Sequence, residues 1–251
     1  MLNFSATQIR YEPYPLVVLR PALDPALYSE LSERYPDVSL FGTHPKYAYK
    51  LSLSEKFMRE NYNRFIAETR SWNRFHAWLK SDDFILATVK FLAANGIDLD
   101  LDESFESAPR RLGRGLSAVG HRRLPSFAPR LRSRFEFSVL KADGGEVEPH
   151  TDTPKKIITL VLSMIKDGEW NPAIGGGLDV NRAVDPRYSF NWKNRKVPWE
   201  SVEVLETIPF VPNQCMMFVK TFNSLHSVRR MTEKGSTALR KSVTIVIERD
   251  E

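Results

Sequence analysis

The sequence predicts an α+β fold, with helices in the first half of the chain and strands in the second. Apolar residues recur at helical spacing in the first half, as at Phe65, Trp72 and Phe75. In residues 239–247, apolar and polar residues instead alternate, as in a strand with one buried face. With 251 residues, 42% of them hydrophobic, the chain can bury a substantial core within a single domain spanning residues 1–251.

The first elements in chain order are a short strand and a helix. The apolar run at residues 16–19 predicts the strand. Asp24 is a good helix cap and Pro25 suits the first helical turn, so we expect a helix from there to about Arg34. Its role is expected to be packing against the sheet.

Two more helices are expected before residue 105. Large apolar side chains between Phe65 and Leu79 predict one helix, and Asp82 is expected to cap another that ends near Gly96. Residues up to about 105 would then form a helical support for the strands that follow. This arrangement leaves the other face of the sheet for a functional site.

Two segments outside these elements are rich in positive charge. The first, at about residues 106–132, holds several arginines and is as compatible with a solvated surface as with a binding site. The second, residues 182–200, mixes cations with large aromatic side chains, which are costly to expose without a use. We expect this second segment to be a loop that contacts substrate through Arg187, Arg195 and Lys196.

A metal site is indicated by His150, Asp152 and His226. His150 and Asp152 are two residues apart at the end of an expected strand, so their side chains share a face. His226 would add a third ligand from another strand. Two histidines and one carboxylate leave coordination positions open, as in non-heme Fe(II) oxygenases. A His-x-Asp pair alone is a weak signal, because any two polar residues at a strand end can share a face.

Arg240 and Ser242 strengthen that interpretation. They lie on the polar face of the alternating stretch, two residues apart and shortly after His226. An arginine can pair with a carboxylate through two hydrogen bonds, and a hydroxyl can add a third. The pair therefore predicts an anchor for a dicarboxylate.

Between Arg132 and Glu248 the chain resembles the iron(II)- and 2-oxoglutarate-dependent dioxygenases, especially their prolyl-hydroxylase-like branch. The segments that carry the resemblance follow the family's order and spacing: 135–140, His150 with Asp152, 156–162, 175–180, 211–218, His226, and Arg240 with Ser242. The resemblance implies a double-stranded β-helix, or jelly-roll, core at about residues 133–251. It also implies that the triad binds iron and that Arg240 and Ser242 hold 2-oxoglutarate. A basic residue before Thr159 often assists in this family, and the sequence leaves open whether Lys155 or Lys156 does so.

The activity implied by the resemblance is hydroxylation. The enzyme would use Fe(II), 2-oxoglutarate and O2 to hydroxylate an unactivated C–H bond, with release of succinate and CO2. Related halogenases lack the carboxylate that Asp152 supplies, which favours hydroxylation over halogenation. The arginine-rich segments favour a polar or anionic substrate, either a small molecule or a group tethered to a larger one. The sequence does not identify the substrate or the oligomeric state.

Other functions remain open from the residues alone. A net charge of +5 and a pI near 9.3 permit electrostatic attachment to phosphates, so a nucleic-acid-binding protein or demethylase is one alternative, although no nucleic-acid-reading motif supports it. A non-enzymatic barrel that binds a small molecule is another. A zinc hydrolase would leave the anchor at Arg240 without a purpose.

The sequence also predicts a cytoplasmic protein. Its only cysteine, Cys215, allows no disulfide within the chain and sits in an apolar pattern typical of a core residue. The first residues lack the basic and apolar pattern of a signal peptide, and no apolar run is long enough for a membrane span.

Overall fold

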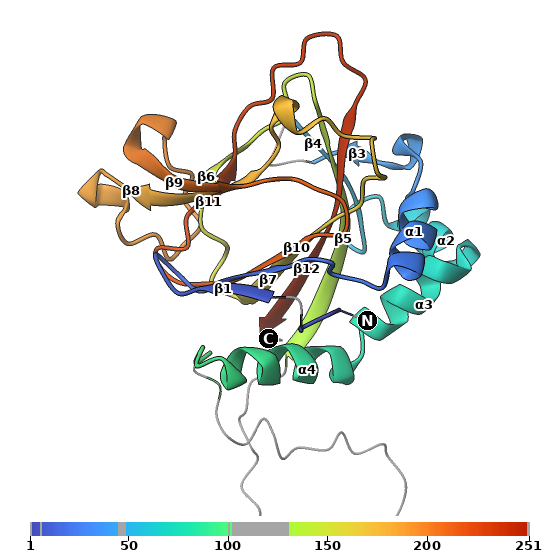
Figure 1. Ribbon diagram of the computed structural model, residues 1–251, viewed down its shortest axis with the longest axis horizontal. Coiled ribbons are helices and arrows are strands. Elements are labelled where there is room, and N and C mark those ends of the chain that lie inside the picture. Colours follow the sequence, from blue (N-terminus) through green and yellow to red (C-terminus); the bar gives the residue numbers. More distant parts are fainter. Residues whose placement is uncertain (1, 6, 45–48, 100, 102–130, 250–251) are drawn as a thin grey trace, which may run out of the picture.

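The computed structural model describes residues 2–5, 7–44, 49–99, 101 and 131–249 (Figure 1). Nearly all of the arginine-rich segment expected at residues 106–132 lies outside the described residues. The strands are β1 (Thr7–Arg10), β2 (Leu16–Leu19), β3 (Gly42–Thr43), β4 (Lys50–Ser54), β5 (Leu131–Lys141), β6 (Val147–His150), β7 (Lys156–Ser163), β8 (Leu178–Ala183), β9 (Val202–Ile208), β10 (Cys215–Val219), β11 (His226–Val228) and β12 (Leu239–Arg249).

The strands form two antiparallel sheets. The larger sheet has the order β1-β2-β10-β7-β12-β5-β4-β3 and the smaller has the order β6-β11-β8-β9. From β5 to β12 the chain passes back and forth between them: β5, β7, β10 and β12 lie in the larger sheet, and β6, β8, β9 and β11 in the smaller. This is the strand order of a double-stranded β-helix, or jelly roll. The fold class expected from the sequence is thereby confirmed.

The first half of the chain contributes strands as well as helices. The strand expected at residues 16–19 is confirmed as β2, and β1 and β2 extend the larger sheet beside β10. β4 and β3 extend its other edge beside β5. The helical support expected up to about residue 105 therefore contains three further strands, β1, β3 and β4, which are too short to show a clear alternation in sequence.

The helices lie against one face of the larger sheet (Figure 1). They are α1 (Pro25–Glu33), α2 (Arg59–Glu68), α3 (Arg70–Leu79) and α4 (Asp82–Ala94), with 3-10 turns at Val38–Leu40, Pro172–Ile174, Pro186–Tyr188 and Trp199–Ser201. Asp24 caps α1 as predicted, its carboxylate accepting from the backbone N–H of Ala26 at 3.0 Å. No helix among the described residues has the length and apolar character needed to cross a membrane.

Two expectations about these helices were wrong in detail. The single helix expected between Phe65 and Leu79 is two helices, because Thr69 adopts extended dihedral angles between α2 and α3. The cap of α4 is Ser81 rather than Asp82: the Ser81 hydroxyl accepts from the backbone N–H of Phe84 at 3.3 Å. Asp82 lies in the first turn, where its charge favours the helix dipole.

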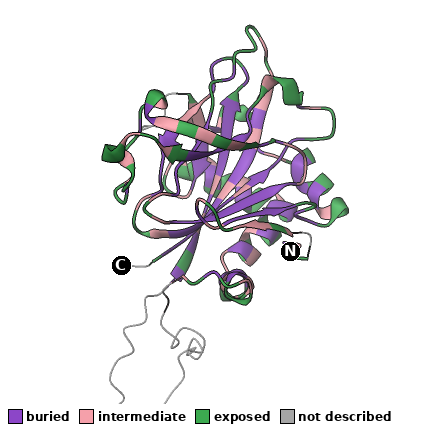
Figure 2. Cartoon of the chain, turned by 60° about the vertical axis from the view of Figure 1, so that its left-hand side comes forward, coloured by how far each residue is buried: buried purple, intermediate pink, exposed green. Residues whose placement is uncertain are grey.

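The main hydrophobic core fills the space between the helices and the larger sheet. Phe135 and Phe137 of β5 face it, and the Phe137 ring centroid lies 4.7 Å from that of Trp72 on α3. Val243 and Ile245 of β12 are buried in the same core. Figure 2 shows the buried residues concentrated along these central strands. The opposite face of the same strands is therefore turned toward the smaller sheet, where the polar side chains of β12 gather.

Candidate metal centre and anion pocket

The three predicted metal ligands lie together between the two sheets. His150 is the last residue of β6, and His226, the first residue of β11, is its direct partner across the antiparallel pair. Asp152 follows two residues after His150. One donor atom from each of the three side chains lies within 4.8 Å of the others, and all three residues are buried.

Both histidine rings are oriented by backbone carbonyls. The Nδ1 atom of His150 lies 2.8 Å from the carbonyl oxygen of Glu148, and that of His226 lies 3.0 Å from the carbonyl oxygen of Ser224. Because a carbonyl oxygen only accepts, Nδ1 carries the proton in each ring. The Nε2 atom is then the one with a lone pair, which is the form in which a histidine ligates a metal.

The electrostatic setting also suits a cation. Burial, with the neighbouring His226 ring, lowers the pKa of His150 to about 3. Burial lowers the pKa of His226 in the same way. Burial alone would raise the pKa of Asp152, but the Lys156 ammonium and the two neighbouring histidines together outweigh it and hold that pKa well below its usual value. The site therefore presents two neutral imidazoles and one carboxylate at neutral pH.

Asp152 is held by two neighbours on β7. The Thr159 hydroxyl donates to its Oδ2 at 2.6 Å, and the Lys156 ammonium donates to its Oδ1. These contacts fix the carboxylate at the wall of the site, as outer hydrogen bonds commonly do for metal ligands. Of the two lysines that precede Thr159, Lys156 reaches the site and Lys155 is exposed.

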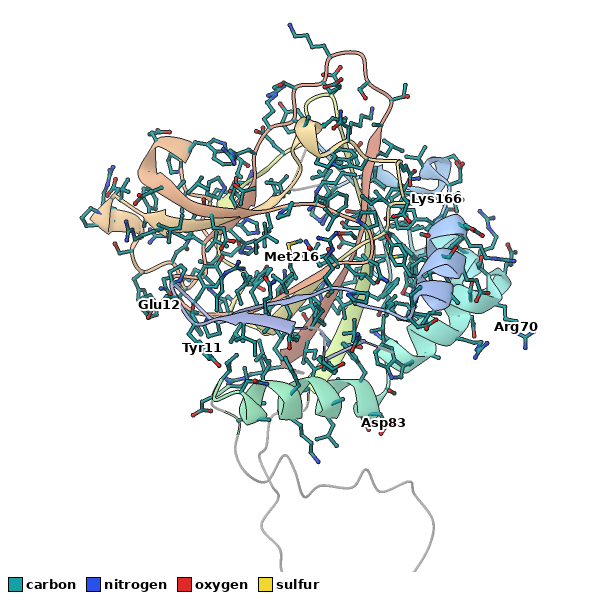
Figure 3. All side chains as sticks on the ribbon, in the orientation of Figure 1. Tyr11, Glu12, Arg70, Asp83, Lys166 and Met216 are labelled. Carbon is teal, nitrogen blue, oxygen red and sulfur yellow. The ribbon has the colours of Figure 1, made fainter. Side chains whose placement is uncertain are left out.

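The triad opens into a cavity of about 130 Å³, a volume suited to a small organic molecule. Arg240, Ser242 and Lys156 line the same cavity. Apolar walls come from Val161, Leu178 and Phe218. Side chains fill the rest of the space between the sheets, including Met216 of β10 (Figure 3).

Arg240 is buried in this cavity with no acidic partner among the described residues. It is 4% exposed; its Nε donates to the carbonyl oxygen of Gly176 at 2.5 Å, and its guanidinium carbon lies 4.1 Å from the ring centroid of Phe210. Burial lowers the pKa of Arg240 to about 10, so it remains charged at neutral pH. A buried charge without a counter-ion is costly, and a bound anion would offset that cost.

Gly176 makes this arrangement feasible. Its φ of +78° is in the region that favours glycine, and a Cβ there would lie 3.1 Å from the Cδ of Arg240 and 3.0 Å from the Trp170 ring. A glycine at this position, shortly before β8, therefore allows the close approach of Arg240.

A partly buried ion pair occupies the neighbouring strands. Lys50 of β4 and Glu136 of β5 lie 2.5 Å apart, and Glu136 also accepts from the hydroxyls of Ser52 and Ser138. Burial would raise the pKa of Glu136, but Lys50 lowers it to about 2. Lys50 lines the cavity. The sequence gave no signal for Lys50, which sits on a strand that was not expected.

The structure does not bring the three expected substrate contacts into the cavity lining. Arg187 pairs with Asp185 at 2.5 Å and its side chain is 79% exposed. Lys196 pairs with Glu148, and Arg195 is exposed. The expected loop is present between β8 and β9, but these charged groups lie outside the cavity that holds the triad.

Comparison with known proteins gives structural matches only: no protein-family model matches the chain, and no curated protein does. A prolyl hydroxylase from Trichoplax adhaerens, solved with a hypoxia-inducible-factor peptide fragment, is similar with a TM-score of 0.47 and 9% identity, over 93% of this chain and 83% of that one. A Pseudomonas putida prolyl-4-hydroxylase is similar with a TM-score of 0.40 and 13% identity, over 90% of this chain and 85% of that one. HygX from Streptomyces hygroscopicus was solved with nickel, 2-oxoglutarate and hygromycin B. It is similar with a TM-score of 0.47 and 9% identity, over 98% of this chain and 84% of that one. At these scores the account of the site rests on the strand order and the residues themselves.

Proposed function

We propose that this protein is an Fe(II)- and 2-oxoglutarate-dependent oxygenase that hydroxylates an unactivated C–H bond of a polar or anionic substrate. The main supporting observation is that Arg240 lies in the same cavity as the cluster of two histidines and one carboxylate. Arg240 is buried there and has no acidic partner among the described residues. A metal site alone fits many activities. A metal site that shares a small cavity with a buried guanidinium suits a particular kind of co-substrate. Such a molecule chelates the metal at one end and carries a carboxylate at the other.

The residues present fit Fe(II). The set offers two Nε2 atoms and one carboxylate oxygen, with hydrogen bonds behind each ligand, and leaves coordination positions for other molecules. Fe(II) held by His150, Asp152 and His226 would supply the O2-dependent chemistry that converts 2-oxoglutarate to succinate and CO2 and hydroxylates the substrate.

The protein's own groups would bind and orient the co-substrate. The Nη atoms of Arg240 would donate to the distal carboxylate of 2-oxoglutarate, with the Ser242 hydroxyl donating a further hydrogen bond. The Gly176 carbonyl and the Phe210 ring hold the guanidinium in place before the ligand arrives. The apolar side chains of Val161 and Phe218 line the same cavity and would disfavour water beside the bound co-substrate.

This proposal is tested by following 2-oxoglutarate turnover. The purified protein is incubated with Fe(II), ascorbate, O2 and 2-oxoglutarate, with and without fractionated metabolite pools, and succinate is measured. We expect slow succinate formation without substrate, stimulation by the fraction that contains the substrate, and loss of both after chelation of the metal. Succinate formation that is insensitive to chelation would contradict the proposal.

Lys156 is expected to assist the binding of 2-oxoglutarate, and Lys155 is not. The Lys156 ammonium reaches the cavity beside Asp152, where it would attract an anionic ligand, whereas Lys155 is exposed. We expect Lys156→Met to weaken 2-oxoglutarate binding by about 3- to 10-fold, the effect of one charged contact in a partly solvated site.

Lys155→Met is the matched control, because it removes the same charge from the adjacent residue. The dissociation constant for 2-oxoglutarate would be measured for both variants with Mn(II) bound. Equal weakening in the two variants would mean that only the overall charge of this segment matters.

A further inference from the structure

Lys220 is a buried lysine that stands behind the metal site rather than in the cavity. It follows β10 and is 9% exposed. Its ammonium donates to the Thr151 hydroxyl at 3.0 Å, to the carbonyl oxygen of Asn191 at 3.2 Å and to the carbonyl oxygen of Thr221 at 2.9 Å. The three N–H donors of the ammonium therefore have three oxygen acceptors. The ring of Trp192 covers the same ammonium, with its centroid 5.0 Å from Nζ.

Thr151 is the residue between His150 and Asp152, and it is fully buried. Its hydroxyl accepts from Lys220 and donates to the carbonyl oxygen of Asn191, so it is held from two sides. The segment before it is held as well, because the backbone N–H of Val197 donates to the Pro149 carbonyl at 2.8 Å. The backbone that carries His150 and Asp152 is thus held by hydrogen bonds on both sides of His150, at Pro149 and at Thr151.

Two of these contacts, those made by Asn191 and Val197, come from the loop between β8 and β9. Asn191 is fully buried, and its side chain closes the loop by accepting from the backbone N–H of Arg195 at 3.0 Å and donating to the Arg195 carbonyl at 2.6 Å. Its own backbone N–H donates to the Phe222 carbonyl at 2.8 Å. One aromatic side chain of this loop, Trp192, covers the buried Lys220 behind the ligand segment.

We propose that Lys220 is a positioning residue that holds Thr151 and thereby fixes the two metal ligands on either side of it. No acidic side chain of the described residues pairs with this ammonium, so it is bound by neutral oxygens alone. Burying a charge in this way costs stability, and a charged donor makes a stronger hydrogen bond than a neutral one. The gain is a rigid spacing of His150 and Asp152, which a metal of fixed geometry requires. This inference rests on the proposed metal-binding function.

The test compares Mn(II) binding by the wild-type protein, by four single variants and by one double variant that combines Lys220→Met with Thr151→Val. Mn(II) is chosen because it does not oxidise in air. Lys220→Met removes the donors but keeps the length of the side chain, Thr151→Val removes the hydroxyl but keeps the shape, and Thr151→Ser keeps the hydroxyl. Lys193→Met, an exposed lysine of the same loop, is the charge-matched control. The affinity is measured by electron paramagnetic resonance, and the unfolding midpoint of the metal-free protein is measured in parallel.

We expect Lys220→Met and Thr151→Val each to bind Mn(II) about 10- to 100-fold more weakly, as is typical for loss of a group that orients metal ligands. Combining them should add little, because both act on one contact. Thr151→Ser and Lys193→Met should bind as the wild type does. With Mn(II) saturating, the affinity of Lys220→Met for 2-oxoglutarate should be unchanged.

The inference is overturned if folded Lys220→Met binds Mn(II) as tightly as the wild type while only its unfolding midpoint falls. If Lys220→Met does not fold, the two Thr151 variants decide, and equal affinities of Thr151→Val and Thr151→Ser overturn it. A wild-type protein that binds no Mn(II) or Fe(II) would overturn the proposed function as well. Equally tight metal binding by the wild type and by every variant would overturn the role of Lys220 alone.

Discussion

Replacing His226 by alanine is expected to abolish Fe(II) binding and 2-oxoglutarate turnover. In the proposed site His226 is one of three ligands found among the described residues, and removing it leaves a single histidine and a carboxylate. Loss of a group that merely orients a ligand typically costs 10- to 100-fold in affinity, so loss of the ligand itself should cost more than about 100-fold. Equilibrium dialysis against Fe(II) under argon, followed by a succinate assay, measures both quantities. We expect the same result for His150→Ala and Asp152→Ala.

His76→Ala is the matched control for this variant. His76 lies on α3, packed edge-on against the ring of Phe135 and outside the cavity. It should retain metal binding, although removing its ring from the core lowers stability. Circular dichroism of the metal-free proteins would show that His226→Ala keeps the fold. A folded His226→Ala that binds Fe(II) with wild-type affinity would remove this residue from the site.

Arg240→Ala is expected to weaken 2-oxoglutarate binding by about 10- to 100-fold, which corresponds to loss of a charge-assisted pair of about 1.5–3 kcal/mol. The guanidinium is buried and already held by the Gly176 carbonyl, so the contact with a carboxylate requires little rearrangement. Metal affinity should change little, because Arg240 is not a ligand. The measurement is a 2-oxoglutarate titration of the Mn(II)-loaded protein by calorimetry.

Arg249→Ala is the control for charge. It removes an arginine from the exposed end of the same strand, β12, and should leave 2-oxoglutarate binding as it is. Arg240→Lys adds a second comparison, since it keeps the charge but loses the planar fork, and its affinity should lie between those of wild type and Arg240→Ala. If Arg240→Ala and Arg249→Ala bind 2-oxoglutarate equally well, Arg240 has no part in anchoring it.

Much of the jelly-roll core could be predicted from the sequence because strands with one apolar face have a simple period. The alternation in residues 239–247 placed Arg240 and Ser242 on one face and Val243 and Ile245 on the other, and the structure confirms both faces. The proximity of His226 to His150 does not follow from this period. It depends on pairing between β6 and β11, which the family resemblance implied and the register shows.

The remaining parts depend on tertiary contacts that leave no local pattern. Lys156 reaches Asp152 only because the turn before β7 folds back toward the site. Lys220 and Asn191 meet Thr151 across segments far apart in the chain. A buried lysine and an exposed one look alike in a sequence, since their environments differ only after folding.

The charged loop shows the same limit. Its composition indicated a use for the aromatic and basic side chains, and contact with substrate was the predicted use. Trp192 instead covers the Lys220 ammonium, and the Arg187 charge is matched by Asp185 at the surface. The sequence carried information on which groups the loop contains, but not on which way they point.

The measurement that tests the central claim most directly is an anaerobic titration of the Fe(II)-loaded protein with 2-oxoglutarate, followed by visible absorption. Chelation of the iron by the keto-acid end should produce a metal-to-ligand charge-transfer band that saturates at one equivalent per chain. The band should be absent in His226→Ala, and in Arg240→Ala it should appear only at higher 2-oxoglutarate concentrations. If the wild-type protein retains Fe(II) but develops no such band at any 2-oxoglutarate concentration, the proposed function is wrong.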